Sequence, residues 1–191
     1  MAILKIARMG HPVLMKPARE VTDPTNPTVH ALINDMVETL LDAPGVGLAA
    51  PQVHVAARIV VFHVPQGRGG ERDEAVPLTA LINPKIEALD DEMEDGVEGC
   101  LSLPDMAGTV PRYKRICYTA MAPDGSTIKR EAEGFHARVV QHECDHLDGI
   151  LYPMRMKDLA KLGYTEEMSK ASTSETSETE TPKELLEQAD G

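Results

Sequence analysis

The 191-residue sequence has no tryptophan, only four tyrosines and two phenylalanines, and only three cysteines. With so few aromatic side chains, the core must be filled by aliphatic residues and by the ten methionines. An odd number of cysteines with no disulfide framework is typical of a reducing compartment. Residues 1–14 lack the apolar core of a signal peptide, and no run approaches the ~18 apolar residues of a membrane span. These absences predict a cytoplasmic protein that does not associate with membranes.

Basic residues are also scarce. Lysine and arginine number 19 against 31 acidic residues, so the formal net charge is −12. Residues 165–191 hold eight acidic and two basic residues and therefore contribute −6 of that charge. The rest of the chain is mildly acidic and offers no basic groove for nucleic acid, so we expect no binding to DNA.

The sequence predicts a catalytic domain followed by a tail. Residues 1–164 are long enough to bury one good core, which predicts a single domain. Residues 165–191 form an acidic tail, in which Ser169–Thr181 is rich in Ser, Thr and Glu and is expected to be disordered. Thr181, Pro182 and Glu184 then form a capping box, but the segment is too short for a stable helix of its own.

Hydrophobic periodicity and turn residues outline the elements of the domain. Asn26 and Pro27 form an N-cap and first-turn pair. Apolar residues then recur at helical spacing to about Asp42, namely Leu32, Ile33, Met36, Val37, Leu40 and Leu41. Strands are expected over 58–64, 78–89, 113–121 and 127–133, with a polar loop over 66–75 and a hairpin turn over 123–125. A last helix is expected from about Gly134 to near Gly149, because glycine commonly caps the C-terminal end of a helix. This order of elements predicts an α+β fold.

The most informative stretch is residues 141–149, Gln-His-Glu-Cys-Asp-His-Leu-Asp-Gly. Its His-Glu-x-x-His pattern puts His142 and His146 one helical turn apart on the same face, where both imidazoles can bind one metal ion. Glu143 lies beside them and can move protons to and from a water molecule. The pattern therefore predicts a metallohydrolase.

A catalytic metal of this kind usually has three protein ligands and one open position. Long metalloprotease motifs place a third His six residues after the second, but that position is Tyr152 here. A protease with a downstream ligand could use Glu166 or Glu167, which lie at the edge of the low-complexity tail. The better third ligand is Cys100, in Glu-Gly-Cys-Leu-Ser-Leu-Pro, because a thiolate binds borderline metals strongly.

A third segment, 45–52, reads Gly-Val-Gly-Leu-Ala-Ala-Pro-Gln. Its small residues indicate that a backbone or a ligand passes close by. Gln52 carries a neutral amide donor, which suits the stabilisation of an oxyanion.

These three segments, in this order, resemble the motifs of the peptide deformylase family, which are Gly-x-Gly-Leu-Ala-Ala-x-Gln, Glu-Gly-Cys-Leu-Ser and Gln-His-Glu-x-x-Asp-His-Leu. None has a mismatch at a defining position, and residues 10–14 resemble a further family pattern, Gly-Asp-Pro-Val-Leu. The resemblance extends to about Arg155. It implies a metal-dependent hydrolase that removes the N-formyl group from the initiating methionine of new polypeptides. It also implies antiparallel sheets wrapped around a central helix that carries the metal motif.

The resemblance assigns roles by position. The implied metal ligands are Cys100, His142 and His146, with Glu143 as the general acid and base. Gln52 and the backbone N–H of Leu101 would form the oxyanion site. The family favours ferrous iron, and zinc, nickel or cobalt can occupy the same site.

The resemblance also implies substrate contacts with N-formyl-methionyl nascent peptides. The methionine pocket would be bordered by Val46, Phe135 and the aliphatic part of Arg138, and the peptide backbone would lie beside Gly47, Glu98 and Gly99. Some members carry an Arg near the substrate where this chain has Ala107. Some bacterial members are thought to dock on the ribosome through a basic C-terminal helix, a contact that the acidic tail here disfavours.

Two other classes remain open at this stage, a metallopeptidase that cuts internal peptide bonds and a metal-binding protein without catalytic activity. Tyr152 argues against the first, and the presence of Glu143 and Gln52 argues against the second. The remaining cysteines, Cys117 and Cys144, are expected to be core residues. Five histidines lack ligand spacing and are expected to be structural or exposed, namely His11, His30, His54, His63 and His136.

Overall fold

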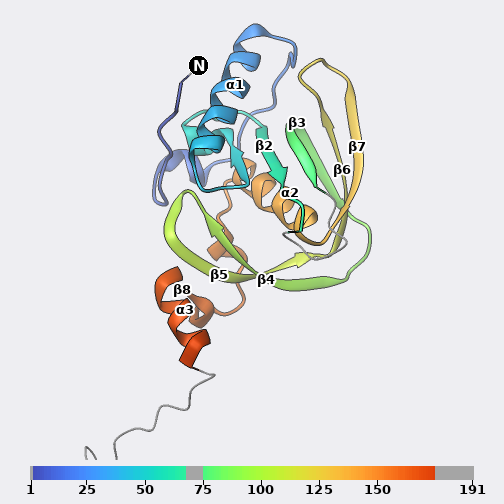
Figure 1. Ribbon diagram of the computed structural model, residues 1–191. Coiled ribbons are helices and arrows are strands. Elements are labelled where there is room, and N and C mark those ends of the chain that lie inside the picture. Colours follow the sequence, from blue (N-terminus) through green and yellow to red (C-terminus); the bar gives the residue numbers. More distant parts are fainter. Residues whose placement is uncertain (1, 68–74, 175–191) are drawn as a thin grey trace, which may run out of the picture.

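The computed structural model describes residues 2–67 and 75–174, and in it two antiparallel sheets enclose the helix α2, Gly134–Leu147 (Figure 1). A five-stranded sheet has the order β1 (Gly47–Ala49), β2 (Ile59–Val64), β3 (Val76–Ala88), β6 (Arg115–Met121) and β7 (Thr127–Glu133). A three-stranded sheet has the order β4 (Met93–Cys100), β5 (Leu103–Tyr113) and β8 (Leu162–Tyr164). The expected α+β class with antiparallel sheets around a central helix is confirmed.

Short 3-10 helices join these elements, at Pro12–Met15, Ala50–Val53, Tyr152–Arg155 and Leu159–Lys161. No helix in the described part of the chain is both long and apolar enough to span a membrane. Part of the polar loop expected over 66–75, and the capping box expected at 181–184, lie outside the described residues.

Helix α1 (Pro27–Asp42) begins and ends where the sequence predicts. The Asn26 side chain accepts a hydrogen bond from the Thr28 N–H at 2.9 Å, and Pro27 occupies the first turn, where no backbone donor is needed. The predicted apolar face is one residue too wide, because Leu41 is 68% exposed. The remaining apolar residues of α1 pack against β1 and β2.

Strand β2 separates two apolar clusters. Because side chains alternate across a strand, Val60 and Phe62 face the cluster around α2, whereas Ile59 and Val61 face the cluster under α1. All four side chains are fully buried. The helix that carries the metal motif is therefore held against a sheet that is itself covered on its other face.

The C-terminal end of α2 is fixed by a Schellman motif. Gly149 has a φ of 74°, and its N–H donates to the His146 carbonyl at 3.3 Å while the Ile150 N–H donates to the Asp145 carbonyl at 2.9 Å. A Cβ at Gly149 would lie 2.7 Å from the Lys16 backbone nitrogen. The glycine thus lets the N-terminal segment contact the helix end directly beside the second histidine of the motif.

The hairpin of β4 and β5 was not predicted from the sequence. Its strands pair antiparallel, with Gly99 opposite Ala107, and Tyr113 ends β5 instead of starting the strand that was expected over 113–121. The hairpin crosses beneath α2 in Figure 1. It brings the end of β4 to the metal motif.

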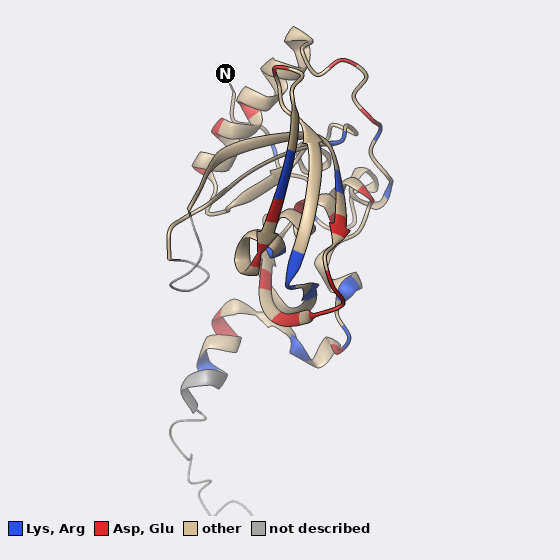
Figure 2. Ribbon diagram, turned by 90° about the vertical axis from the view of Figure 1, so that its right-hand side faces the viewer, with Lys and Arg blue, Asp and Glu red and all other residues tan. Residues whose placement is uncertain are grey.

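The acidic tail that was expected from residue 165 begins with helix α3 (Thr165–Ser174), at the lower end of the ribbon in Figure 2. This helix extends into residues 169–174, the first part of the segment 169–181 that was expected to be disordered. Glu166 and Glu167 lie in its first turn, where negative charge is favourable, and Lys170 pairs with both. A Cβ built on Gly163 of β8 would lie 3.2 Å from Met168 Cγ, so the Met168 side chain packs close to this strand. The rest of the tail lies outside the described residues.

Candidate metal and active site

Three potential ligand atoms meet where β4 ends against α2. One atom each from Cys100, His142 and His146 lies within 4.8 Å of the other two, and Cys100 Sγ is 3.3 Å from His146 Nε2. Cys100 is the last residue of β4, and the two histidines occupy successive turns of α2. The fold therefore brings together the three residues that the sequence singled out, from segments 42 positions apart.

The ring orientations fit a bound metal. His142 Nδ1 is 2.8 Å from a Glu98 carboxylate oxygen, which leaves Nε2 to face the cluster. The His142 ring also stacks on Tyr152, with ring centroids 6.2 Å apart and planes at 24°. Tyr152, at the third-histidine position of the long protease motif, thus packs against one of the candidate ligands. One sulfur and two imidazole nitrogens suit a borderline divalent cation such as zinc or ferrous iron.

Glu98 orients His142 because it is itself held by two arginines. Its carboxylate accepts hydrogen bonds from Arg112 at 2.9 and 3.0 Å and from Arg138 at 2.9 Å. Burial alone would raise the Glu98 pKa, but the hydrogen bonds and charges of Arg112 and His142 outweigh it and lower the pKa to about 2. Glu98 therefore stays ionised and keeps the proton of His142 on Nδ1.

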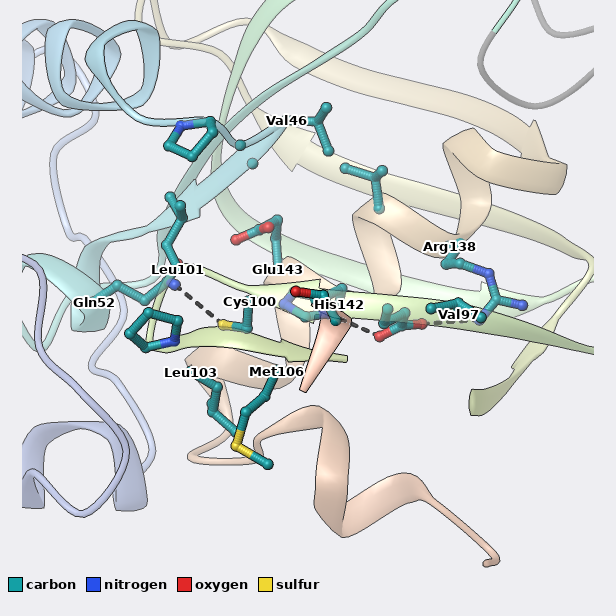
Figure 3. A pocket seen from close by; sticks show the side chains of 18 of the residues that line it. Val46, Gln52, Val97, Cys100, Leu101, Leu103, Met106, Arg138, His142 and Glu143 are labelled. Atoms are coloured by element: carbon teal, nitrogen blue, oxygen red, sulfur yellow. Dashed lines mark hydrogen bonds and ion pairs between the residues drawn. The ribbon is translucent and has the colours of Figure 1, made fainter. Parts of the chain in front are cut away.

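Glu143 is buried, with 4% of its surface exposed, and lies beside the ligand cluster (Figure 3). Burial raises its pKa to about 7, and the nearby charge of His142 only partly offsets that effect. Its Oε2 has no hydrogen-bond partner among the described residues, and its carboxylate lies directly against Gly47 of β1. A carboxyl group with a pKa near neutrality and a free oxygen can both accept and donate a proton.

Gln52 reaches the cluster from the 3-10 helix that follows β1. Its Oε1 accepts a hydrogen bond from the Ala49 N–H at 2.8 Å, which turns the amide NH₂ towards Cys100 Sγ at 3.5 Å and Ser102 Oγ at 3.2 Å. Gln52 is 1% exposed, so this orientation is held by packing as well. Leu101 follows Cys100 in the turn between β4 and β5.

A cavity of about 480 Å³ opens beside these residues. In Figure 3, Glu143, Cys100 and His142 lie in the centre of the group of lining residues, with Val46 above them and with Arg138 and Val97 to the right. All six residues predicted to contact substrate line it, namely Val46, Gly47, Glu98, Gly99, Phe135 and Arg138. His146 is not among the residues that line the cavity, and only 1% of its surface is exposed.

Several other lining residues were not expected from the sequence, among them Val97, Asp105, Met106 and Thr165. They come from the unpredicted hairpin and from α3. Ala107 is 5% exposed and pairs with Gly163 of β8, so this position is part of the sheet and does not line the cavity.

The two other cysteines are core residues, as expected. Cys117 and Cys144 are 8% and 7% exposed, and burial raises the pKa of the Cys144 thiol well above its usual range. Of the five histidines without ligand spacing, His136 is buried against Tyr118. His11 caps the first 3-10 helix by accepting the Val13 N–H.

Residues 3–162 match the model of the polypeptide deformylase family. The chain is 55% identical over 161 residues to peptide deformylase 1 of Bordetella pertussis, covering 84% of this chain and 92% of that protein. The Met-Ala-Ser-bound class I type b peptide deformylase of Acinetobacter baumannii superposes with a TM-score of 0.76 at 32% identity, covering 81% of this chain and 99% of that one.

The peptide deformylase of Ehrlichia chaffeensis in complex with actinonin gives a TM-score of 0.77 at 30% identity, covering 94% of this chain and 100% of that one. The family match spans the three candidate ligands, the five-stranded sheet and both strands of the β4–β5 hairpin. The chain belongs to the polypeptide deformylase family, the metal-dependent hydrolases that remove the N-formyl group from the N-terminal methionine of newly made polypeptides.

Proposed function

We propose that Cys100, His142 and His146 hold one divalent cation, ferrous iron in the cell, and that the adjoining cavity binds N-formyl-methionyl peptides for hydrolysis of the formamide bond. The observation that carries this proposal is the convergence of the three ligand atoms within 4.8 Å, at a place where Cys100 and His142 also line the cavity. Zinc, nickel or cobalt would fit the same donor set. A fourth position, open to the cavity, is left for water and substrate.

Glu143 is the proton carrier in this mechanism. When bound, a divalent cation acidifies a water molecule and polarises the formyl carbonyl. Glu143 takes the proton from that water as it attacks the formyl carbon, and delivers it to the amine nitrogen as the C–N bond breaks. A pKa of about 7 suits both transfers at neutral pH. The products are formate and a peptide with a free amino terminus.

Gln52 and Leu101 stabilise the negative charge that develops on the formyl oxygen. The Gln52 NH₂ is already aimed at the cluster by the Ala49 N–H, so no reorganisation is needed during the reaction. The Leu101 N–H supplies the second donor. Loss of one such donor is expected to lower kcat on the order of 100- to 1000-fold.

The methionine side chain lies against Val46, Phe135 and the aliphatic part of Arg138. The Arg138 guanidinium is occupied by Glu98 and by backbone carbonyls, so only its methylene groups are free to contact an apolar side chain. At Gly99 a Cβ would meet nothing closer than the Met106 carbonyl oxygen at 3.6 Å, so there is space beside this residue for the approach of a substrate backbone. The tripeptide bound in the Acinetobacter baumannii structure supports a peptide in this cavity.

The test is formate release from a formyl-Met-Ala peptide by anaerobically purified protein, with and without added ferrous iron. Glu143→Ala should retain the metal and lose nearly all turnover. Near-normal turnover with full metal content would refute the role of Glu143. Cleavage of unformylated peptides at internal bonds, without formate release, would instead support a metallopeptidase, and metal binding without either reaction would support a non-catalytic protein.

A further inference from the structure

A line of ion pairs, buried except at Arg155, leads from His142 to the opposite side of α2. Glu98 binds His142 and accepts two hydrogen bonds from Arg112. Arg112 Nη1 also lies 2.5 Å from Asp145 Oδ2. Asp145 in turn accepts two hydrogen bonds from Arg155, at 2.7 and 3.1 Å. The line thus runs from a metal ligand to a residue on a separate element, the 3-10 helix that follows α2.

Arg112 and Asp145 are positioned so that a change at Arg155 would alter the position of Glu98, which binds His142. Arg112 is 4% exposed and joins a carboxylate of β4 to a carboxylate of α2, so it ties the strand that supplies Cys100 to the helix that supplies both histidines. Asp145 lies on α2 between His142 and His146 and is 6% exposed. By contrast, the Arg155 side chain is 46% exposed and lines a second cavity of about 570 Å³ behind the helix.

Arg155 is one of the positive charges that neutralise the buried Asp145 carboxylate. In the described part of the chain, Asp145 has two cationic partners, Arg112 and Arg155. Without Arg155 the buried Asp145 would depend on Arg112 alone and would compete for it with Glu98. A buried carboxylate that loses a partner is strongly destabilised, so Arg112 would move towards Asp145 at the expense of its two bonds to Glu98.

We propose that Arg155 is a positioning residue for the metal centre, acting through Asp145, Arg112 and Glu98 on the ring of His142. The inference rests on the proposed ligand set. Groups that directly orient a ligand typically affect metal affinity 10- to 100-fold, and Arg155 acts from further away, so its loss is expected to weaken metal binding about 3- to 10-fold. The planar fork of Arg155 holds both oxygens of Asp145, which a lysine cannot do.

Arg58 provides a matched control. Its guanidinium binds Asp148 at 2.7 Å and the Leu147 carbonyl at 3.3 Å, at the same end of α2. It lines the same cavity as Arg155 but has no bond to Glu98, Arg112 or Asp145 among those found in the described chain. Arg58→Gln therefore removes a helix-end ion pair without touching the line to His142.

The experiment uses the full chain loaded with cobalt, whose thiolate charge-transfer and d–d absorption report the ligand geometry, titrated with a competing chelator. Arg155→Gln should bind cobalt about 3- to 10-fold more weakly than the unaltered chain and show a shifted absorption spectrum. Arg58→Gln should match the unaltered chain in both. If Arg155→Gln binds and absorbs like Arg58→Gln, the inference is overturned.

Two further variants keep the result interpretable. Should Arg155→Gln not fold, Arg155→Lys carries the test, because it retains the charge and loses the fork; weaker cobalt binding supports the inference and unchanged binding overturns it. His142→Ala examines the ligand set itself. Cobalt affinity unchanged in His142→Ala would mean that the proposed ligand set is wrong, whereas a large loss there with a normal Arg155→Gln would leave the ligand set intact and remove only the role of Arg155.

Discussion

Replacing Gly47 by alanine tests whether turnover depends on the position of the Glu143 carboxylate. Gly47 opens β1, and the Glu143 side chain lies directly against it. A Cβ built on Gly47 would lie 2.6 Å from Glu143 Cδ and 2.8 Å from Glu143 Cγ. Strand β1 is held by its pairing with β2, so we expect the Glu143 side chain to move and the backbone of β1 to stay in place.

The size of the effect follows from these distances. Carbon atoms in contact prefer a separation of about 3.5–4.0 Å, so the carboxylate must retreat by roughly 1 Å. A misplacement of that size in a reacting group can lower the rate on the order of 100-fold. Overpacking a buried site typically costs about 1–3 kcal/mol of stability, which a domain of this size can tolerate. We therefore expect a folded protein with about 1% of the normal kcat.

The assay is anaerobic formate release from formyl-Met-Ala, with metal content and thermal unfolding measured on the same preparations. Gly163→Ala is the control, because it adds the same methyl group to a strand glycine whose nearest neighbour is the flexible Met168 side chain. Gly47→Ala should keep its metal, since the nearest atoms to the new methyl belong to Glu143 and not to the ligands. A kcat close to that of Gly163→Ala, with the metal retained, would refute a precise placement of Glu143.

Three other outcomes are expected. Tyr152→Phe should leave the free energy of unfolding unchanged or raise it by about 1 kcal/mol, because the buried hydroxyl has no partner among the described residues; a clear loss in urea unfolding would contradict this. The depressed pKa of Glu98 predicts stability that is full above about pH 4.5 and lost as the pH falls towards 2, up to roughly 3 kcal/mol. Urea unfolding of the chain and of Glu98→Gln, both in chelator, should therefore differ less at pH 3 than at pH 6. Deleting residues 175–191 should leave kcat/KM on short formylated peptides within about twofold, because every residue assigned to the site lies earlier in the chain.

The ligands of the candidate site could be predicted because their signals are local. Spacing along a helix places His142 and His146 on one face, and a Gly-Cys pair before a turn marks Cys100. The caps of α1 and α2 are equally local, since each depends on a few consecutive residues such as Asn26 and Gly149. These predictions agree with the structure because tertiary packing stabilises the same conformation that the local sequence favours.

The hairpin of β4 and β5 could not be predicted for the opposite reason. Residues 93–100 are rich in acidic residues and glycine, and most of their side chains are exposed, so β4 has no apolar alternation. Its stability comes from elsewhere in the chain. Arg138 on α2 donates to the carbonyls of Glu94 and Gly96 on β4 and of Val110 on β5, and a Cβ at Gly96 would lie 2.6 Å from that guanidinium. The hairpin is thus specified by a side chain some 40 positions downstream.

The same limit applies to the groups that orient the ligands. Glu98 lies only two residues before Cys100, but β4 itself was not predicted, so the sequence did not indicate that Glu98 orients the ring of His142. Nothing local indicates that Arg112 joins Glu98 to Asp145, since the three residues come from two strands and a helix and meet only after folding. Buried charges such as these are costly unless every one is paired, so their positions depend on one another. A motif can therefore mark the candidate ligands of a metal, whereas the residues that orient those ligands, Arg155 among them in our proposal, have no motif of their own.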